Sequence, residues 1–164
     1  KNCSSTSAVG PARADWQAVK ALLQRVSSAR VEVAGDCVGH IDQGLLVLLG
    51  LGKADDEATA DRMLDKLLAF RVFADEVGRM NRSVADVDGG VLLVSQFTLC
   101  ADTGKGLRPG FSSAMPPAAA QSLYDYTLTA LRQRHPRVAA GLFGADMQVS
   151  LTNDGPVTFL LELA

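Results

Sequence analysis

Four polar or aromatic residues, Ser95-Gln96-Phe97-Thr98, follow the apolar residues 91–94, where the sequence predicts a buried strand. Strand alternation would put Gln96 and Thr98 on one face. Buried polar groups need hydrogen-bond partners, so side chains of this kind at the end of a core strand are candidates for chemistry. A strand that runs out of the core into solvent would show the same pattern, and that alternative stays open.

A second candidate is Asn153-Asp154-Gly155-Pro156, which separates two predicted strands at residues 146–152 and 157–163. Asp154-Gly155 alone is typical of an ordinary hairpin turn. Pro156 adds a special feature, because proline removes a ladder donor and an X-Pro bond is the common site of a cis peptide. A cis bond would place two carbonyl oxygens side by side.

A third candidate is the Gly-, Pro- and Ser-rich segment 102–117, a long loop that carries Lys105 and Arg108. Two cations in such a loop could hold phosphate, although a solvated charged loop is equally consistent with the pattern. The formal net charge of the chain is −2. Any contact with nucleic acid must therefore depend on local positive charge.

Several common catalytic arrangements are missing from the sequence. The two histidines, His40 and His135, are predicted in a hairpin strand and at a helix end, where surface or capping roles are usual. We find no G-x-S-x-G elbow, phosphate loop or metal-ligand cluster, and we expect neither a metal ion nor another cofactor. Three scattered cysteines without a C-x-x-C pair favour a reduced cytosolic protein.

The elements that must position these motifs fit one domain of residues 19–164. Strands are predicted at residues 20–34, 37–41, 45–49, 71–73, 91–99, 146–152 and 157–163. Helices are predicted to start at Asp55-Asp56-Glu57 and at Pro116-Pro117, the second ending before Pro136. The longest apolar run, 45–49, is far shorter than the ~20 residues of a membrane span. This pattern predicts an α+β fold with a largely antiparallel sheet.

The two motifs, extended to residues 95–99 and 153–158, resemble the two signatures of the D-aminoacyl-tRNA deacylases. Further segments are similar to the same family, in the right order: residues 20–26, 78–81, 108–109, 123–126 and 144–150. The resemblance runs from about Val19, where that family normally begins with Met, to Leu163. Residues 1–18 are therefore predicted to be a dispensable disordered tail or an extension upstream of the start site.

The resemblance implies a tight homodimer of small barrel-like α+β domains with two main helices and active sites at the subunit interface. It implies that Gly155-Pro156 is cis and reaches into the partner's pocket, and that Arg25 holds this motif. It implies a catalytic wall and a set of substrate-binding residues. The catalytic wall is Gln96, Phe97 and Thr98, and the substrate-binding residues are Ser95, Gly155, Pro156, Arg25, Asn153, Met147 and Phe143.

The implied reaction is hydrolysis of the ester between a D-amino acid and tRNA, with main-chain N–H groups near Phe97 and Thr98 stabilising the oxyanion. Carbonyl groups of Gly155 and Pro156 would exclude an L side chain, and glycyl-tRNA would be accepted. No histidine is available as a base for Thr98, so we favour attack by water, assisted by the ribose 2′-OH. Thr98 as a covalent nucleophile is the alternative mechanism.

The partner implied is the acceptor end of aminoacylated tRNA in the cytoplasm, held by Lys105 and Arg108. A tRNA-binding module without catalysis would use the same loop and strand end. A purely structural dimer would leave Gln96 in a core strand unexplained.

Overall fold

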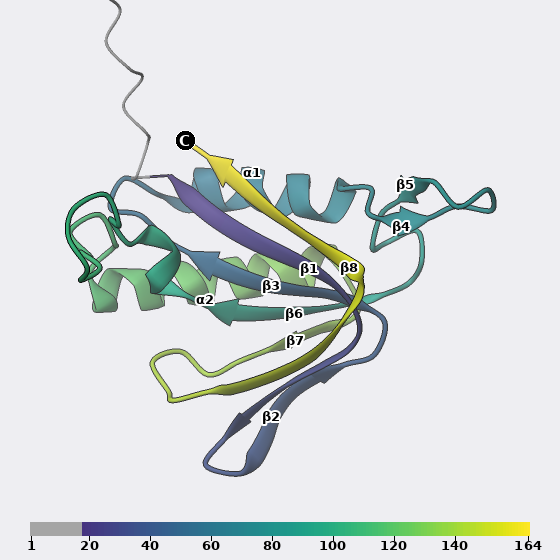
Figure 1. Ribbon diagram of the computed structural model, residues 1–164, viewed down its shortest axis with the longest axis horizontal. Coiled ribbons are helices and arrows are strands. Elements are labelled where there is room, and N and C mark those ends of the chain that lie inside the picture. Colours follow the sequence, from purple (N-terminus) through teal and green to yellow (C-terminus); the bar gives the residue numbers. More distant parts are fainter. Residues whose placement is uncertain (1–17) are drawn as a thin grey trace, which may run out of the picture.

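The computed structural model describes residues 18–164, and its centre is a curved six-stranded sheet with two helices packed on one face (Figure 1). The strands of this sheet are β1 (Val19–Val33), β2 (Asp36–Ile41), β3 (Gly44–Gly50), β6 (Gly90–Ser95), β7 (Val138–Ala140) and β8 (Gln148–Leu163). The helices are α1 (Glu57–Ala69), α2 (Pro117–Arg134) and the short 3-10 helix η1 (Phe97–Cys100). A separate two-stranded ribbon consists of β4 (Phe73–Ala74) and β5 (Met80–Arg82).

The sheet is mixed: three of its five strand pairs are antiparallel, in line with the predicted largely antiparallel sheet, and the other two are parallel, which was not predicted. β1 pairs antiparallel with β2, β3 and β8, whereas β6 runs parallel to both β3 and β7. α1 lies in the connection from β3 to β6, and α2 lies in the connection from β6 to β7. Because a helix carries the chain back to the starting edge of the sheet, the next strand runs parallel to the previous one. The sequence pattern showed the strands and helices but not that β6 and β7 would pair in this way.

The long strand β1 curls the sheet into a nearly closed barrel. One stretch of β1, Lys20–Val26, pairs with β3, and the following stretch, Ala29–Val33, pairs with β2. β2 is thereby brought against β7 at the far edge: a Cβ atom on Gly39 would lie 2.4 Å from the Ala140 carbonyl oxygen. The barrel-like α+β architecture with two main helices is confirmed.

β3 has apolar residues on both faces, and both faces are buried. Leu45, Val47 and Leu49 belong to the large hydrophobic cluster between the sheet and the helices. Leu46 belongs to the smaller cluster inside the curl of the sheet, together with Leu92 and other strand residues. The prediction that residues 45–49 are covered on two sides is confirmed, as expected for a strand with a parallel neighbour.

The predicted strand 91–99 ends earlier than expected. β6 stops at Ser95, and the Gln96 N–H donates to the Leu49 carbonyl at 2.7 Å before the chain turns into η1. η1 packs directly over Gly50, where an added Cβ would lie 2.9 Å from the Leu99 Cβ. The polar residues after the apolar run therefore belong to a short helix at the strand end, so the expected strand alternation of Gln96 and Thr98 is wrong.

The predicted hairpin at residues 153–156 is also wrong. β8 is one strand that bends sharply at this motif (Figure 1), and it pairs with β1 on both sides of the bend, so its two halves do not pair with each other as the arms of a hairpin would. Asn153 pairs with Val26 and Thr158 with Gln24, which leaves the four residues 154–157 opposite Arg25 alone. The motif is a bulge in a long strand. We refer to residues 154–157 as the β8 bulge.

Smaller differences concern residues away from the predicted motifs. β5 and β7 were not predicted, because each has only three residues. His135 caps α2 as expected, through its backbone N–H to Leu131, but it is buried, and its Nε2 hydrogen-bonds the Gly89 carbonyl at 2.7 Å. The tail predicted over residues 1–18 lies outside the described residues, except for Ala18.

Candidate active site

A pocket of about 420 Å³ opens where the parallel strands β3 and β6 end. Its walls come from these strand ends, η1, the loop of residues 101–116, the first turn of α2 and the segment Phe143-Gly144. Most lining side chains are apolar, and Ser95 and Gln96 supply polar groups. Four residues predicted for the site, Ser95, Gln96, Phe97 and Phe143, are thus brought together here.

η1 gives this pocket its polar edge. The Gln96 Nε2 donates to the Thr98 Oγ1 at 2.5 Å, so the amide holds the hydroxyl of the residue two positions on. Thr98 is exposed beside the pocket. Phe97 and Thr98 are the first two residues of η1, and the first N–H groups of a helix have no acceptor within it. Such N–H groups can stabilise a negative charge that develops at this edge.

Aromatic rings form the outer part of the pocket. The Phe97 ring, 57% exposed, packs against the Phe111 ring at a centroid distance of 5.0 Å. On the other side, the Phe143 ring lies 5.7 Å from the Tyr124 ring, whose hydroxyl donates to the Leu93 carbonyl at 3.0 Å. Burial raises the pKa of Tyr124 to about 12, so this hydroxyl stays protonated and keeps its hydrogen bond at neutral pH.

Met147 does not join the pocket. It packs instead against the cluster inside the curl of the sheet, with its Sδ above Gly141, where an added Cβ would lie 2.7 Å away. Of the two residues predicted as neighbours of the adenosine or aminoacyl group, the structure therefore brings only Phe143 to the pocket.

The β8 bulge is held by side chains that bind its backbone. Arg25, the single β1 residue opposite it, donates from Nε to the Asp154 carbonyl at 3.0 Å and from Nη1 to the Val72 carbonyl at 2.7 Å. The Asn153 Oδ1 accepts the Val157 N–H at 2.9 Å. The Asn153 side chain therefore binds the backbone at the other end of the bulge, and this contact stabilises the path of the bulge.

Gly155 is the residue that this backbone path requires. Its φ is +136°, a conformation that residues with a Cβ rarely adopt, and an added Cβ would lie 2.7 Å from the Val157 Cγ2. The Gly155-Pro156 peptide bond is cis, as the family resemblance implied. Residues 154–157 have no register partner in β1, so the carbonyl groups of Gly155 and Pro156 lie outside the strand ladder.

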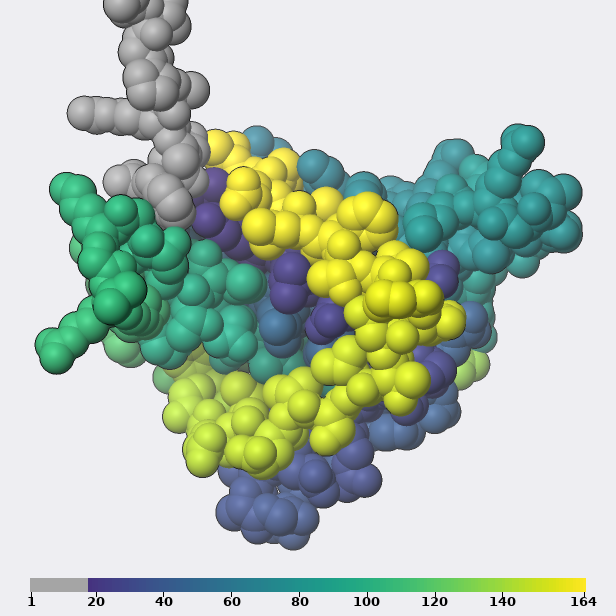
Figure 2. All heavy atoms as spheres, in the orientation of Figure 1, coloured from purple at the N-terminus to yellow at the C-terminus, as the bar shows by residue number. Residues whose placement is uncertain are grey.

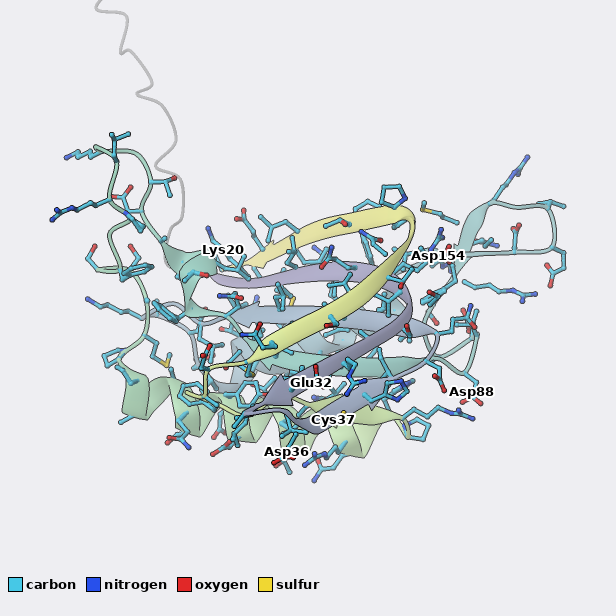
Figure 3. All side chains as sticks on the ribbon, turned by 60° about the horizontal axis from the view of Figure 1, so that its bottom comes forward. Lys20, Glu32, Asp36, Cys37, Asp88 and Asp154 are labelled. Atoms are coloured by element: carbon cyan, nitrogen blue, oxygen red, sulfur yellow. The ribbon has the colours of Figure 1, made fainter. Side chains whose placement is uncertain are left out.

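The pocket lies at the C-terminal ends of β3 and β6, whereas the β8 bulge is level with the N-terminal ends of these two strands. Ser95 is level with Leu49 and Ala21, whereas Asn153, next to the bulge, is level with Val26. Five residues of β1 separate the two levels, which is about 17 Å along the strand. Figure 3 shows the same separation, with Lys20 at one end of the sheet and Asp154 at the bend of β8. One chain therefore does not bring its two motifs together.

Comparison with known proteins decides the family. The model of the D-Tyr-tRNA(Tyr) deacylase family matches residues 22–162, a span that includes both motifs. The chain belongs to this family. Relatives named D-aminoacyl-tRNA deacylase from Stutzerimonas stutzeri (strain A1501) and Cellvibrio japonicus (strain Ueda107) are each 66% identical to it. The first match covers 88% of this chain and 99% of the relative, and the second covers 87% and 97%.

Two solved structures share the fold of this chain. The c-Myc DNA unwinding element binding protein superposes with a TM-score of 0.85 at 42% identity, over 88% of this chain and 99% of that one. A probable eukaryotic D-amino acid tRNA deacylase superposes with a TM-score of 0.80 over 89% of this chain and all of that one. Its sequence identity is 15%, so the second comparison shows the shared fold alone.

The loop beside the pocket also carries the cations that are predicted to bind phosphate. Asp102 and Gly110 exchange two backbone hydrogen bonds, of 2.7 and 2.9 Å, and so close the neck of this loop. Lys105 and Arg108 lie beyond the neck and are exposed, and no ion pair joins either of them to another residue within 18–164. Phe111, at its base, lines the pocket.

Sequence reasoning missed Phe111 as a pocket residue. Its signal was present, because aromatic residues make up only 5% of the chain and this one lies in a loop rich in Gly and Pro. It also missed the Val72 carbonyl as an acceptor for Arg25, and no side-chain pattern could have revealed a backbone group.

Metal-binding clusters and membrane-spanning helices are both absent from residues 18–164. This span contains no group of three or more His, Cys, Asp or Glu side chains placed to hold a metal ion. No helix in it combines the length and apolar character needed to cross a membrane.

Neither histidine lines the pocket. His40 lies in β2, with its Nε2 3.6 Å from the Asp42 Oδ1. The ring of His135 is hydrogen-bonded to the Gly89 carbonyl, just before β6.

Proposed function

We propose that this chain hydrolyses the ester bond of D-aminoacyl-tRNA and releases the D-amino acid and the tRNA. The observation that carries the proposal is 66% identity to relatives named for this activity, over nearly their whole length. The pocket at the end of β6 is of a size that suits an aminoacyl group on the terminal adenosine.

The pocket supplies the groups that ester hydrolysis needs. Attack on the ester carbonyl creates an oxyanion, and the N–H groups of Phe97 and Thr98 at the start of η1 stabilise it. Ser95 and Gln96 offer the polar contacts that orient the aminoacyl group, and the rings of Phe97 and Phe143 contact its apolar parts. No cofactor takes part in this scheme.

Water is the proposed attacking group. Thr98 has no histidine beside it, and its Oγ1 already accepts a hydrogen bond from Gln96. A hydroxyl without a general base is a weak nucleophile. The ribose 2′-OH of the substrate therefore assists the water, and Thr98 positions it. Covalent attack by Thr98 is the alternative mechanism, which differs in requiring an acyl-enzyme intermediate.

A second copy of the chain completes the site. The pocket and the β8 bulge are about 17 Å apart along the strands of one chain, so a bulge that acts on the pocket comes from a partner subunit. β8 is a raised band across the face seen in Figure 2, and its exposed apolar residues support a dimer contact there. These residues, 36–49% exposed, are Val149, Leu151, Phe159 and Leu160.

Chirality is read by the backbone of the partner's bulge. The carbonyl oxygens of Gly155 and Pro156 occupy the side of the pocket where an L side chain would lie, and they reject it sterically. Arg25 and Asn153 contribute by holding the bulge. Glycyl-tRNA is a substrate as well, because glycine has no side chain to reject.

The acceptor end of the tRNA is held by local positive charge. Lys105 and Arg108 bind its phosphates beside the pocket, since the chain as a whole carries a net charge of −2. This arrangement positions the RNA without reading its sequence.

The rival function is binding of nucleic acid without hydrolysis. It is supported by the name of the 42% identical relative, a DNA unwinding element binding protein. Incubation of the purified chain with D-tyrosyl-, L-tyrosyl- and glycyl-tRNA distinguishes the two functions. Multiple-turnover release of D-tyrosine and glycine, with the L-ester spared, supports the enzyme. Stoichiometric binding of D-tyrosyl-tRNA without turnover supports the rival.

A further inference from the structure

Asp55 ties together two segments behind the pocket. It lies between β3 and α1, and its Oδ1 accepts the N–H of Val19, the first residue of β1, at 2.9 Å. Its Oδ2 accepts the Gly52 N–H at 2.6 Å, and the Asp55 N–H donates to the Gly52 carbonyl at 3.1 Å. One carboxylate therefore fixes both the start of β1 and the tight turn of residues 52–55.

The segment that Asp55 fixes carries one wall of the pocket. Gly52 forms an isolated bridge with Ala114, and the Met115 N–H donates to the Leu51 carbonyl at 3.0 Å. Leu51, Ala114 and Met115 all line the pocket. Asp55 does not touch the pocket itself, but a single hydrogen bond separates it from the backbone that forms this wall.

Only an ionised carboxylate satisfies both N–H groups. Burial raises the pKa of Asp55 to about 6, against the opposing effect of its two backbone hydrogen bonds, so the group is charged at neutral pH. Each of its oxygens then accepts one N–H. An asparagine has one acceptor oxygen, and its NH₂ group would face the second N–H donor.

The neighbouring Asp56 has a different role and provides a matched control. Its Oδ1 accepts the Thr59 N–H and the Thr59 hydroxyl, both at 2.8 Å, which makes it the N-cap of α1. The two adjacent aspartates thus serve different partners: Asp56 holds a helix end, and Asp55 holds the wall of the pocket.

We propose that Asp55 is a positioning residue for the pocket, which sets substrate affinity by fixing the wall formed by Leu51, Ala114 and Met115. The inference rests on the proposed hydrolysis of D-aminoacyl-tRNA. Without the hydrogen bond to Gly52 this wall shifts, while Gln96, at the start of the reacting edge, keeps its own hydrogen bond to the Leu49 carbonyl. The expected signature is a raised KM with a smaller change in kcat.

The test compares Asp55→Asn with Asp56→Ala in the full-length protein on D-tyrosyl-tRNA, at a temperature below the unfolding of both variants. Asp56→Ala lowers Tm and leaves KM unchanged. Asp55→Asn raises KM, by a factor on the order of ten, because a displaced wall loses contacts that bind the substrate equally in its ground state and its transition state. Asp55→Asn with the parental KM overturns the inference, as does a KM that rises equally in both variants. A parent protein that does not hydrolyse D-tyrosyl-tRNA is a failure of the proposed function instead.

If the Asp55→Asn variant fails to fold, a second measurement on the parent protein tests the same inference. Amide hydrogen exchange is followed at Gly52 with and without a non-hydrolysable D-tyrosyl adenosine amide. If Asp55 couples this amide to the pocket wall, filling the pocket slows the exchange of Gly52. Equal exchange rates with and without the ligand contradict the inference.

Discussion

The pocket and the β8 bulge are constructed in opposite ways. The pocket is formed by packing: several strand and helix ends meet around apolar side chains, next to the large core cluster. The bulge is formed by hydrogen bonding: four residues face Arg25 alone and depend on Arg25 and Asn153 for their path. In the proposed function the pocket holds the substrate and the bulge of a partner subunit supplies the chiral filter, so each region needs the other.

The largest effect is expected from Gly155→Ala. A Cβ at this positive φ would meet the Val157 side chain and displace the backbone that we propose as the chiral filter. Because small displacements of positioning groups are costly, D-tyrosyl-tRNA hydrolysis should fall on the order of 100-fold. Gly78→Ala is the control, since Gly78 also has a positive φ but no atom within 4 Å of its added Cβ. Similar losses in both variants would mean that the Gly155 effect is general backbone strain.

Arg25→Ala should have the next largest effect. It removes the hydrogen bonds to the carbonyls of Asp154 and Val72 and frees the bulge while leaving the pocket intact. A bond from a charged donor contributes ~2 kcal/mol, so activity should fall by about 30-fold, and selectivity for D over L should fall with it. Arg30→Ala, also on β1, removes only an exposed pair with Glu32 and should change neither value. Undiminished selectivity in Arg25→Ala would separate this arginine from the filter.

Thr98→Ala tests the pocket and should have a smaller effect. If Thr98 only positions water, the variant loses one neutral hydrogen bond, and the rate falls about fivefold, as expected for ~1 kcal/mol. Pre-steady-state kinetics should then show no acyl-enzyme burst. Loss of all turnover, together with an aminoacyl ester trapped on Thr98 and seen by mass spectrometry, would favour the covalent mechanism.

The sequence predicted most of the elements, because helices and strands follow local patterns, and four of the residues that it proposed for the site line one pocket. The apolar run at residues 45–49 predicted a strand covered on two faces, and Asp55-Asp56-Glu57 predicted the start of a helix. The parallel pairing of β3 with β6 was missed, because pairing depends on where the chain returns after α1. Asp154-Gly155 favoured a hairpin, since no local pattern shows that one long strand, β1, pairs on both sides of the motif.

The placement of Met147 shows a limit of a different kind. Its membership of the segment 144–150 linked it to the family and to the substrate. In the structure its side chain packs against the cluster inside the curl and does not line the pocket. A motif can therefore locate a site within the sequence without saying which of its members face the pocket.

The smallest effect concerns the loop cations. Replacing Lys105 and Arg108 together by Ala should weaken tRNA binding and flatten its salt dependence, by about 0.7–0.9 in log–log slope for each phosphate that is no longer neutralised. The double replacement of Lys66 and Arg132, which are exposed on α1 and α2, removes the same charge elsewhere. Affinity measured across a range of salt concentrations distinguishes the two pairs. If the salt slope changes equally in the two double variants, the net charge of the protein determines RNA affinity and the loop has no special role.

The central claim is that the pocket of one subunit works with the bulge of its partner, and mixed dimers test it most directly. One chain carries Gln96→Ala with Phe97→Ala, the other carries Gly155→Ala, and each homodimer should be nearly inactive. A purified heterodimer of the two has one site with a parental pocket and a parental bulge, so it should recover about half of the parental D-tyrosyl-tRNA hydrolysis. Activity no higher than that of the two defective homodimers would contradict the account, because it would mean that each chain needs its own bulge.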